Sequence, residues 1–138
     1  MDTSTLFDFI NKHDLAVIST VSLKQVPESA VIGVAVNEQL EIIFDTTTTS
    51  RKHRNLQFNP NVALVIGWDN EITVQYEGRA QQLTGEELEQ AKAVYFTKFP
   101  DGTIREQWPD IAYYIIRPSW VRYSDFNTDP PLIEETVF

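Results

Sequence analysis

The sequence contains no cysteine, only one methionine and two histidines, and no long apolar run. Without cysteine the chain forms no disulfide, zinc–thiolate centre, iron–sulfur cluster or cysteine nucleophile, and such a composition suits the reducing cytoplasm. No apolar stretch approaches the roughly 20 residues of a membrane-spanning helix. The segment from Met1 to Asn11 also lacks the basic and apolar regions of a signal peptide. We therefore expect a cytoplasmic protein with no membrane partner.

Basic residues are scarce as well, with 11 Lys and Arg against 20 Asp and Glu and a net charge of −9. Nucleic-acid-binding proteins usually present a positive field, so this excess of acid argues against a nucleic-acid partner. With 42% apolar residues the chain has enough apolar surface to bury a core. No repeat or change of composition marks a boundary, and we expect a single domain over residues 1–138.

Short β-branched segments dominate the predicted secondary structure. Pro, Asn, Asp or Gly bounds each segment, which is typical of strands joined by tight turns. The predicted strands are Leu15–Val21, Ala30–Val36, Leu40–Phe44, Val62–Trp68, Ile72–Leu83, Ile111–Ile116 and Trp120–Tyr123. Because the connections are short, we expect antiparallel pairing. The fold class is thus mainly β (α+β), a small barrel of about six to seven mostly antiparallel strands with about three short helices.

Three segments carry helical signals. The apolar spacing within Leu6–Ile10 predicts a short N-terminal helix. A second helix of about two turns is expected over Arg51–Phe58, with Ser50 as its N-cap. The third begins at Thr84, which opens a Thr-x-x-Glu capping box, and ends at Pro100.

Two further features concern the long strand and the end of the chain. Gly78 stands in the middle of Ile72–Leu83, where a glycine predicts a bulge or a bend. The segment Asp125–Phe138 contains Pro130 and Pro131, and we expect it to form an arm or a loosely held tail.

The five residues Ser50–Arg54 hold three of the eleven Lys and Arg residues and one of the two histidines. In the predicted helix these bases lie in the first turn, where the helix dipole is already positive and clustered cations are unfavourable. A bound anion removes that conflict. Backbone N–H groups, hydroxyls from Thr46 to Ser50, and the Arg51 and Lys52 side chains could together hold a phosphate.

The alternative is a solvated surface on which these bases balance acids such as Asp45. Charge and position alone leave both interpretations open. Arg54 faces roughly the opposite way from Lys52 on a helix, so Arg54 and His53 are interpreted as surface groups or as partners of acids.

Several short segments follow one another in a characteristic order along most of the chain. They are Ser19-Thr20, Pro27-x-Ser29-Ala30-Val31, Ile43-Phe44-Asp45-Thr46, Ser50-Arg51-Lys52, Asn59-Pro60-Asn61-Val62, Trp68, Glu77-Gly78-Arg79-Ala80, Tyr95-Phe96, Phe99-Pro100 and Pro118-Ser119-Trp120. Each segment by itself is common in proteins. Their order and spacing resemble the pyridoxamine 5′-phosphate oxidase-like FMN-binding split-barrel family, in particular a general-stress-protein-like member rather than the true oxidase.

The resemblance implies a split β-barrel that forms a homodimer, with one FMN in each of two grooves between the chains. It implies that Arg51 and Lys52 bind the FMN phosphate and that Ser50 and Thr46 contribute their hydroxyls. It further implies that the flavin and its ribityl chain are lined by Ser29, Ala30 and Val31.

Two cofactor positions depart from the oxidase pattern. Thr73 falls where the oxidase has a Gln near the cofactor, so a shorter polar group replaces a longer one. Asp45 replaces a Tyr. We retain both as cofactor-binding candidates, and we expect Asp45 to face Arg51, Lys52 or water, because an acid beside a phosphate is unfavourable.

The substrate site of the oxidase is matched only in part. Tyr95 and Thr103 fall near its Tyr and Ser positions, but Phe99 stands where an Arg binds the substrate phosphate. Phe cannot hold a phosphate, and the tail carries no Arg or His. The hypothesis is a pocket at Tyr95, Phe99 and Thr103 for an uncharged or aromatic small molecule. The alternative is that Tyr95 and Phe99, four residues apart on a helix, make core or dimer contacts.

Flavin chemistry resides in the cofactor, so the lack of a catalytic triad or a metal-binding pattern is no obstacle. The leading hypothesis is an FMN-dependent oxidoreductase with unassigned catalytic residues and no metal site. One alternative is a non-enzymatic flavin-binding or stress-related protein. Another is a split barrel that uses a deazaflavin or haem. Haem would need His13 or His53 as an axial ligand, and both stand beside polar residues that favour a solvated role.

Overall fold

Short helices interrupt a run of strands along the whole chain, which the computed structural model describes from Met1 to Phe138. The helices are α1 (Thr3–Asn11), α2 (Arg51–Leu56), α3 (Gly85–Lys98) and α4 (Gly102–Arg105). The strands are β1 (Leu15–Val21), β2 (Pro27–Gly33), β3 (Ala35–Val36), β4 (Ile42–Thr47), β5 (Asn61–Ile66), β6 (Ile72–Gln82), β7 (Ile111–Asp125) and β8 (Leu132–Val137).

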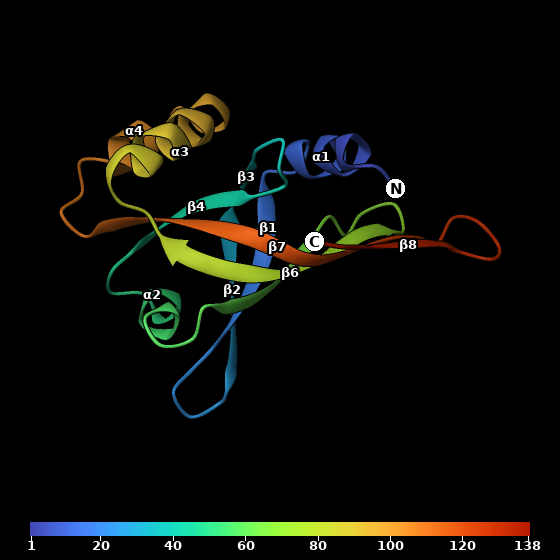
Figure 1. Cartoon of the computed structure of the whole chain (residues 1–138), viewed down its shortest axis with the longest axis horizontal. Helices are drawn as coiled ribbons and strands as arrows, with labels where there is room; N and C mark the ends of the chain where they lie inside the picture. Colours follow the sequence, from blue (N-terminus) through green and yellow to red (C-terminus); the bar gives the residue numbers. More distant parts are fainter.

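All of the strands belong to one antiparallel sheet with the order β2-β1-β5-β6-β7-β4-β3, and β8 pairs with β7. The first half of β7 pairs with β4 and its second half pairs with β8, while β6 runs along its other edge. The sheet curls into a half-barrel, with α1 and α3 on one side and α2 near one end (Figure 1). The predicted fold class, a mainly β, mostly antiparallel split barrel, is confirmed.

Alternating side chains of the strands fill two cores. The main core contains 22 buried residues, among them Phe44 and Tyr76, which are fully buried. The Tyr76 hydroxyl donates to the carbonyl oxygens of Leu40 (2.7 Å) and Ile116 (3.1 Å), so this buried polar group is satisfied. A second cluster of seven buried residues, which includes Tyr95, lies under α3. It fixes α3 against β4 and β7.

Three predicted strands are divided differently in the structure. The segment Ala30–Val36 contributes to two strands, β2 and β3, because the Val34 N–H donates to the Asp14 carbonyl (3.0 Å) outside the ladder. The strands predicted at Ile111–Ile116 and Trp120–Tyr123 are one continuous strand, β7. The strand passes through Pro118 because the β6–β7 register shifts there, and a bulge tolerates a residue without an N–H.

The C-terminal segment Asp125–Phe138, expected as an arm or a loose tail, contains β8. The hairpin of β7 and β8 projects from the barrel (Figure 1). Arg122 and Glu135 form an ion pair across the hairpin (2.7 Å), and the amino group of Met1 lies 2.6 Å from Glu134. Backbone pairing and these contacts hold the segment against the rest of the chain.

The helices also differ in detail from the prediction. The structure has four helices rather than three: the sequence did not predict α4. The helix α2 ends at Leu56 rather than at Phe58. Thr84 is the N-cap of α3, but its side chain makes no capping hydrogen bond. Gly85 follows it with a φ of +64°, and the predicted capping box does not form.

Gly78 lies at the register shift between β6 and β7, as the sequence predicts. A Cβ at this position would lie 2.4 Å from the Arg117 carbonyl oxygen and 3.0 Å from an Ile116 methyl group. Because the backbone cannot yield as a side-chain end does, Gly78→Ala is expected to lower the free energy of unfolding by about 1–3 kcal/mol. Urea denaturation measures the change. Gln82→Ala, at the exposed end of β6, is the control, and an unchanged stability of Gly78→Ala would contradict the close approach.

Candidate functional site

The start of α2 is held to the end of β4 by two hydroxyl groups. Ser50 is the N-cap of α2, and its Oγ accepts a hydrogen bond from the His53 N–H (3.2 Å). The same Oγ lies 2.9 Å from Oγ1 of Thr46, which is buried. The fold therefore brings the two predicted hydroxyl donors together, immediately before Arg51 and Lys52.

The side chain of Arg51 is 64% exposed and pairs with Glu28 on β2, with Nη1 3.2 Å from Oε2. The other carboxylate oxygen of Glu28 accepts from Nδ2 of Asn55 (2.9 Å), which also donates to the Thr20 hydroxyl (2.9 Å). These contacts join α2 to both β1 and β2. Sequence reasoning missed Glu28, because a pairing across 23 positions leaves no local pattern.

Lys52 is half-buried and has neither an ion pair nor a side-chain hydrogen bond. Burial lowers the pKa of its ammonium group, and the nearby Asp45 carboxylate acts in the opposite direction. An ammonium group that loses hydration without gaining a partner is stabilised when an anion binds beside it. Lys52 is therefore the base of the cluster that an anion would satisfy most.

His53 lies between α2 and β7 rather than on a solvated surface. Its Nδ1 lies 2.8 Å from the Tyr114 hydroxyl, to which Gln57 also donates (2.9 Å). The imidazole packs edge-on against the Tyr114 ring, with 5.8 Å between centroids. The interpretation of His53 as a surface group is therefore wrong, whereas Arg54 is exposed as expected.

The burial of His53 makes stability depend on pH. Burial lowers its pKa below the ordinary value of 6.5, so the unfolded chain binds more protons than the fold between the two values. The stability from neutral His53 is complete above pH 6.5 and is lost as the pH falls through that window. His53→Gln is therefore expected to flatten the decline in melting temperature between about pH 8 and pH 5. His13→Gln is the control, and parallel profiles for wild type and His53→Gln would contradict the prediction.

The Asp45 carboxylate points toward α3 and α4, on the opposite side of β4 from Thr46. Its Oδ2 accepts from Nε of Arg105 (2.8 Å), and its Oδ1 accepts from the Tyr95 hydroxyl (3.2 Å). Arg105 also pairs with Asp101 (3.2 Å). The expectation that Asp45 faces Arg51, Lys52 or water is corrected in part: its hydrogen bonds go to Arg105 and Tyr95, and its carboxylate acts on Lys52 only through its charge.

Arg105 is a candidate site residue that sequence reasoning missed. The hydrogen bond to Asp45 raises the pKa of its guanidinium, and burial raises the pKa of the Tyr95 phenol, so both stay protonated at neutral pH. The i,i+4 spacing of Asp101 and Arg105 was the one signal, and it indicates a helical turn rather than a contact with Asp45. The Tyr113 hydroxyl nearby is buried without a partner, and burial raises its pKa to about 12.

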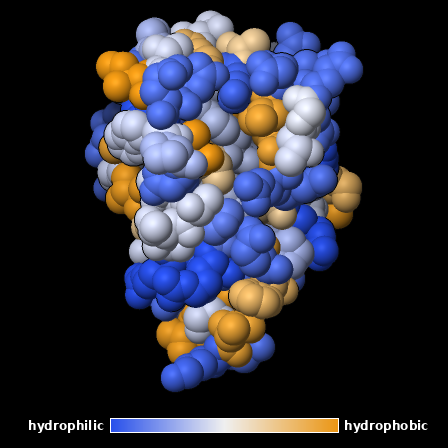
Figure 2. All heavy atoms as spheres, turned by 90° about the vertical axis from the view of Figure 1, so that its left-hand side faces the viewer, coloured by the Kyte–Doolittle hydropathy of each residue, from blue (hydrophilic) through white to orange (hydrophobic).

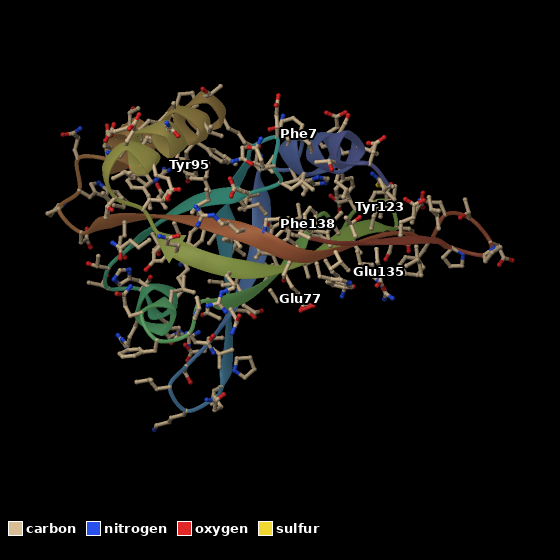
Figure 3. All side chains as sticks on the ribbon, viewed as in Figure 1. Phe7, Glu77, Tyr95, Tyr123, Glu135 and Phe138 are labelled. Atoms are coloured by element: carbon tan, nitrogen blue, oxygen red, sulfur yellow. The ribbon has the colours of Figure 1, made fainter.

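The residues predicted to line the substrate pocket lie along α3 and α4. Tyr95 is 2% exposed, and Figure 3 shows it between α3 and the sheet. Phe99 packs against the Tyr95 ring (5.1 Å between centroids) and over Gly33. Thr103 is exposed, and its hydroxyl donates to the Pro100 carbonyl (2.8 Å). One chain does not bring their polar groups together, and the substrate pocket stays a prediction.

One face of the sheet, here called the outer face, is left open by the helices. Its residues come from neighbouring strands in register: Val17, Ser19, Ser29, Val31, Ala63, Val65, Gln75, Glu77, Trp120, Arg122 and Glu135. Figure 3 shows Glu77 and Glu135 on the same side of the sheet. A cavity of about 320 Å³ is hollowed into this face.

The outer face carries two of the three residues predicted to line the flavin. Val31 is 60% exposed, and the Ser29 hydroxyl lies 2.9 Å from that of Ser19. Ala30 points the other way and packs against the main core. If a flavin lies on β2, Ala30 meets it only through its backbone.

Thr73 lies far, within one chain, from the residues Thr46, Ser50, Arg51 and Lys52, which are here called the phosphate cluster. It pairs with Ser124 near one end of β7, whereas Thr46 pairs with Ala112 near the other end. Up to about 40 Å of strand separates the two positions. The Thr73 hydroxyl is buried and has no hydrogen-bond partner.

The chemistry of the donor set is that of an anion site. Hydroxyl, guanidinium and ammonium groups all donate hydrogen bonds, and the guanidinium and ammonium groups also carry positive charge.

No group of three or more His, Asp or Glu side chains is placed to hold a metal ion. None of the helices is both long and apolar enough to cross a membrane.

Comparison with known proteins gives a family match over most of the chain. A family model described as pyridoxamine 5′-phosphate oxidase matches residues 3–125. The pyridoxine/pyridoxamine 5′-phosphate oxidase of Burkholderia thailandensis is 32% identical over 92 residues, which is 66% of this chain and 41% of that protein. The chain therefore spans less than half the length of the curated relatives it matches.

Solved structures share the fold. A haem-binding protein from Mycobacterium smegmatis has a TM-score of 0.83 at 15% identity, covering 99% of this chain and 58% of that chain. General Stress Protein 26 from Bacillus anthracis has a TM-score of 0.71 at 21% identity, covering 97% of this chain and 98% of that chain. A pyridoxamine 5′-phosphate oxidase-related FMN-binding protein from Nostoc punctiforme has a TM-score of 0.68 at 10% identity, covering 91% of this chain and 86% of that chain. At these identities only the fold is established, so the cofactor has to be argued from side chains.

Proposed function

The chain belongs to the pyridoxamine 5′-phosphate oxidase family, and we propose that it binds FMN and acts as an FMN-dependent oxidoreductase. The observation that carries the proposal is the cluster at the start of α2. There the hydroxyls of Thr46 and Ser50 lie 2.9 Å apart, beside Arg51 and the unpartnered Lys52. Two hydroxyls, a guanidinium and an ammonium group together supply the donors that a phosphate dianion requires.

The strand β2 supports FMN rather than a simple phosphate as the ligand. Glu28 contacts Arg51 from the core-facing side of β2, and Ser29 and Val31 point to the outer face of the same strand. Because β2 is the edge strand of the sheet, a ligand at this edge can contact both sides. A molecule with a phosphate at one end and a flat ring at the other needs such an arrangement. The exposed Val31 offers apolar surface to the ring, and Ser29 offers a hydroxyl.

We propose a homodimer in which FMN lies between the outer faces of two chains. Val31, Val17 and Val65 lie side by side on this face, and Val31 and Val65 are exposed. An exposed apolar patch rimmed by polar residues often marks an interface. We retain Thr73 as a cofactor-binding candidate contributed by the second copy, because it lies too far from the phosphate cluster of its own chain. Both the open face and the isolated Thr73 are then accounted for.

The two histidines favour FMN over haem. His13 holds the Phe9 carbonyl through Nδ1 (2.8 Å), and its other ring nitrogen packs against Gly67. His53 pairs with the Tyr114 hydroxyl and lies between α2 and β7. Neither is on the outer face, where a large planar cofactor would lie, and haem needs an axial ligand at its iron.

We propose that the substrate is a small uncharged or aromatic molecule. Phe99 stands where the resemblance places a phosphate-binding Arg. Of the cations nearby, Arg105 is paired with Asp45 and Asp101, and Lys98 donates to the carbonyl oxygens of His13 and Val34. Bound FMN would supply the redox chemistry, while the residues of this chain hold its phosphate and line its ring. Turnover of pyridoxamine 5′-phosphate at the rate of a true oxidase would overturn this substrate class.

A second candidate is a flavin-binding protein without turnover, because the site consists of phosphate donors and ring-lining side chains and has no assigned catalytic group. Anaerobic addition of NADH or NADPH to the FMN-loaded protein separates the two functions. We expect the flavin absorbance to bleach and then to return when an electron acceptor is added. Bound flavin that neither donor reduces would support the second candidate.

A further inference from the structure

The guanidinium group of Arg51 is held on one side only. Its Nη1 binds Glu28 at 3.2 Å, whereas Nε and Nη2 have no protein partner. A guanidinium offers two parallel N–H groups along its Nε–Nη2 edge, which is the geometry for two-point binding of a phosphate. The contact with Glu28 therefore leaves the most useful edge of Arg51 available.

Glu28 is itself fixed by a buried polar group. Its Oε1 accepts from Nδ2 of Asn55 at 2.9 Å, and Asn55 is 5% exposed. The same nitrogen donates to the hydroxyl of Thr20, which lies opposite Glu28 in the β1–β2 ladder. Thr20, Asn55 and Glu28 thus form a brace that ends on Arg51, the only highly exposed member of the chain of contacts.

A carboxylate near a phosphate repels it, but bases outnumber Glu28 at this place. Lys24 and Arg54 line the same cavity of about 320 Å³ as Glu28 and Arg51, between the β1–β2 turn and α2. Figure 2 shows a band of strongly hydrophilic atoms at the height of α2, above hydrophobic atoms at the lower end of the molecule. The local field therefore stays positive with Glu28 ionised.

The ion pair contributes little to the stability of the fold, because exposed salt bridges gain little from their Coulomb attraction in water. Its larger effect is on the freedom of Arg51. A 64% exposed arginine samples many rotamers, and ordering it opposes binding unless it is ordered beforehand. Glu28, held by Asn55, supplies that order.

We propose that Glu28 is a positioning residue for phosphate recognition, a role that rests on the proposed FMN binding. It holds Nη1 of Arg51 and presents the Nε–Nη2 edge to the phosphate. The consequence is selectivity: the brace strengthens the binding of a phosphorylated flavin and leaves the binding of its unphosphorylated form, riboflavin, unchanged.

The test compares FMN and riboflavin binding to the full chain by flavin fluorescence. Glu28→Gln is expected to raise the Kd for FMN about five- to tenfold and to leave the Kd for riboflavin within about twofold. Glu38→Gln, in the exposed β3–β4 turn, is the matched control and keeps the wild-type ratio. In an Arg51→Gln background, Glu28→Gln causes no further loss.

Other outcomes would overturn the proposal. Unchanged or tighter FMN binding by Glu28→Gln means that the carboxylate does not position Arg51, and equal losses for FMN and riboflavin mean a structural effect. Should Glu28→Gln fail to fold, Arg51→Lys is used, since lysine keeps the charge without the two-point edge. A wild-type FMN preference in Arg51→Lys contradicts the proposal. Failure of the wild type to bind either flavin refutes the proposed function itself, and the role of Glu28 with it.

Discussion

Replacing Arg51 or Lys52 with alanine is expected to weaken FMN binding by about 1.5–3 kcal/mol, roughly a 10- to 150-fold rise in Kd. Each change removes a charge-assisted contact with the phosphate while the Thr46–Ser50 hydroxyl pair remains. Lys52 should show at least as large a loss as Arg51, because it is half-buried and has no other partner. Titration of each purified variant with FMN, followed by flavin fluorescence, measures the effect.

Arg54→Ala is the matched control for these variants. Arg54 lies on the same helix, carries the same charge and lines the same cavity as Arg51, but it is exposed and forms no ion pair or side-chain hydrogen bond. Its removal is expected to leave the Kd for FMN within about twofold of the wild type. Equal losses in all three variants would indicate a diffuse positive field rather than a specific phosphate site.

Val65→Lys on the outer face is expected to convert the proposed homodimer into monomers and to abolish FMN binding at the same time. Val65 is 37% exposed in the single chain, so a lysine there can reach water and the fold is retained. In the dimer the ammonium group would be buried without a partner, which costs several kcal/mol. Sedimentation velocity gives the oligomeric state, and titration with FMN gives the affinity.

Leu23→Lys is the control for this substitution. Leu23 is 69% exposed in the β1–β2 turn and does not lie on the outer face, so the variant should remain dimeric and bind FMN. A dimeric Val65→Lys protein with normal FMN binding would show that the outer face is not the interface. A monomeric one with wild-type affinity would show that a single chain holds the cofactor.

The strands were predictable where their signal is local. The predicted strand Leu15–Val21 matches β1 residue for residue, because alternating burial leaves a periodic pattern in the sequence. Gly78 also predicted the position of the bulge, since only a glycine allows the Arg117 carbonyl to come so close. In both cases the sequence position itself carries the physical requirement.

Features that depend on distant partners could not be predicted in this way. Pro118 normally ends a strand, yet β7 continues because the register shift on β6 accommodates it. The strand β8 forms in an acidic segment because β7 offers it an edge. Single-sequence patterns contain no information about such edges.

The candidate site shows the same division. Arg51 and Lys52 stand out as bases in an acidic chain, and the fold places them beside the predicted hydroxyls. Their separate environments do not follow from the sequence, because Glu28 lies 23 positions before Arg51. Asp45 likewise pairs with Arg105, which lies 60 positions later in the sequence. Its carboxylate therefore forms no hydrogen bond with Arg51 or Lys52.

The central claim, that this chain is a flavoprotein, is tested most directly by the absorption spectrum of the purified full chain and the mass of the ligand that heat releases. We predict the two visible absorption bands of a bound flavin, the mass of FMN, and a stoichiometry of one FMN per chain. Release of haem or a deazaflavin would contradict this account, as would a colourless protein that gains no flavin signal when FMN is added.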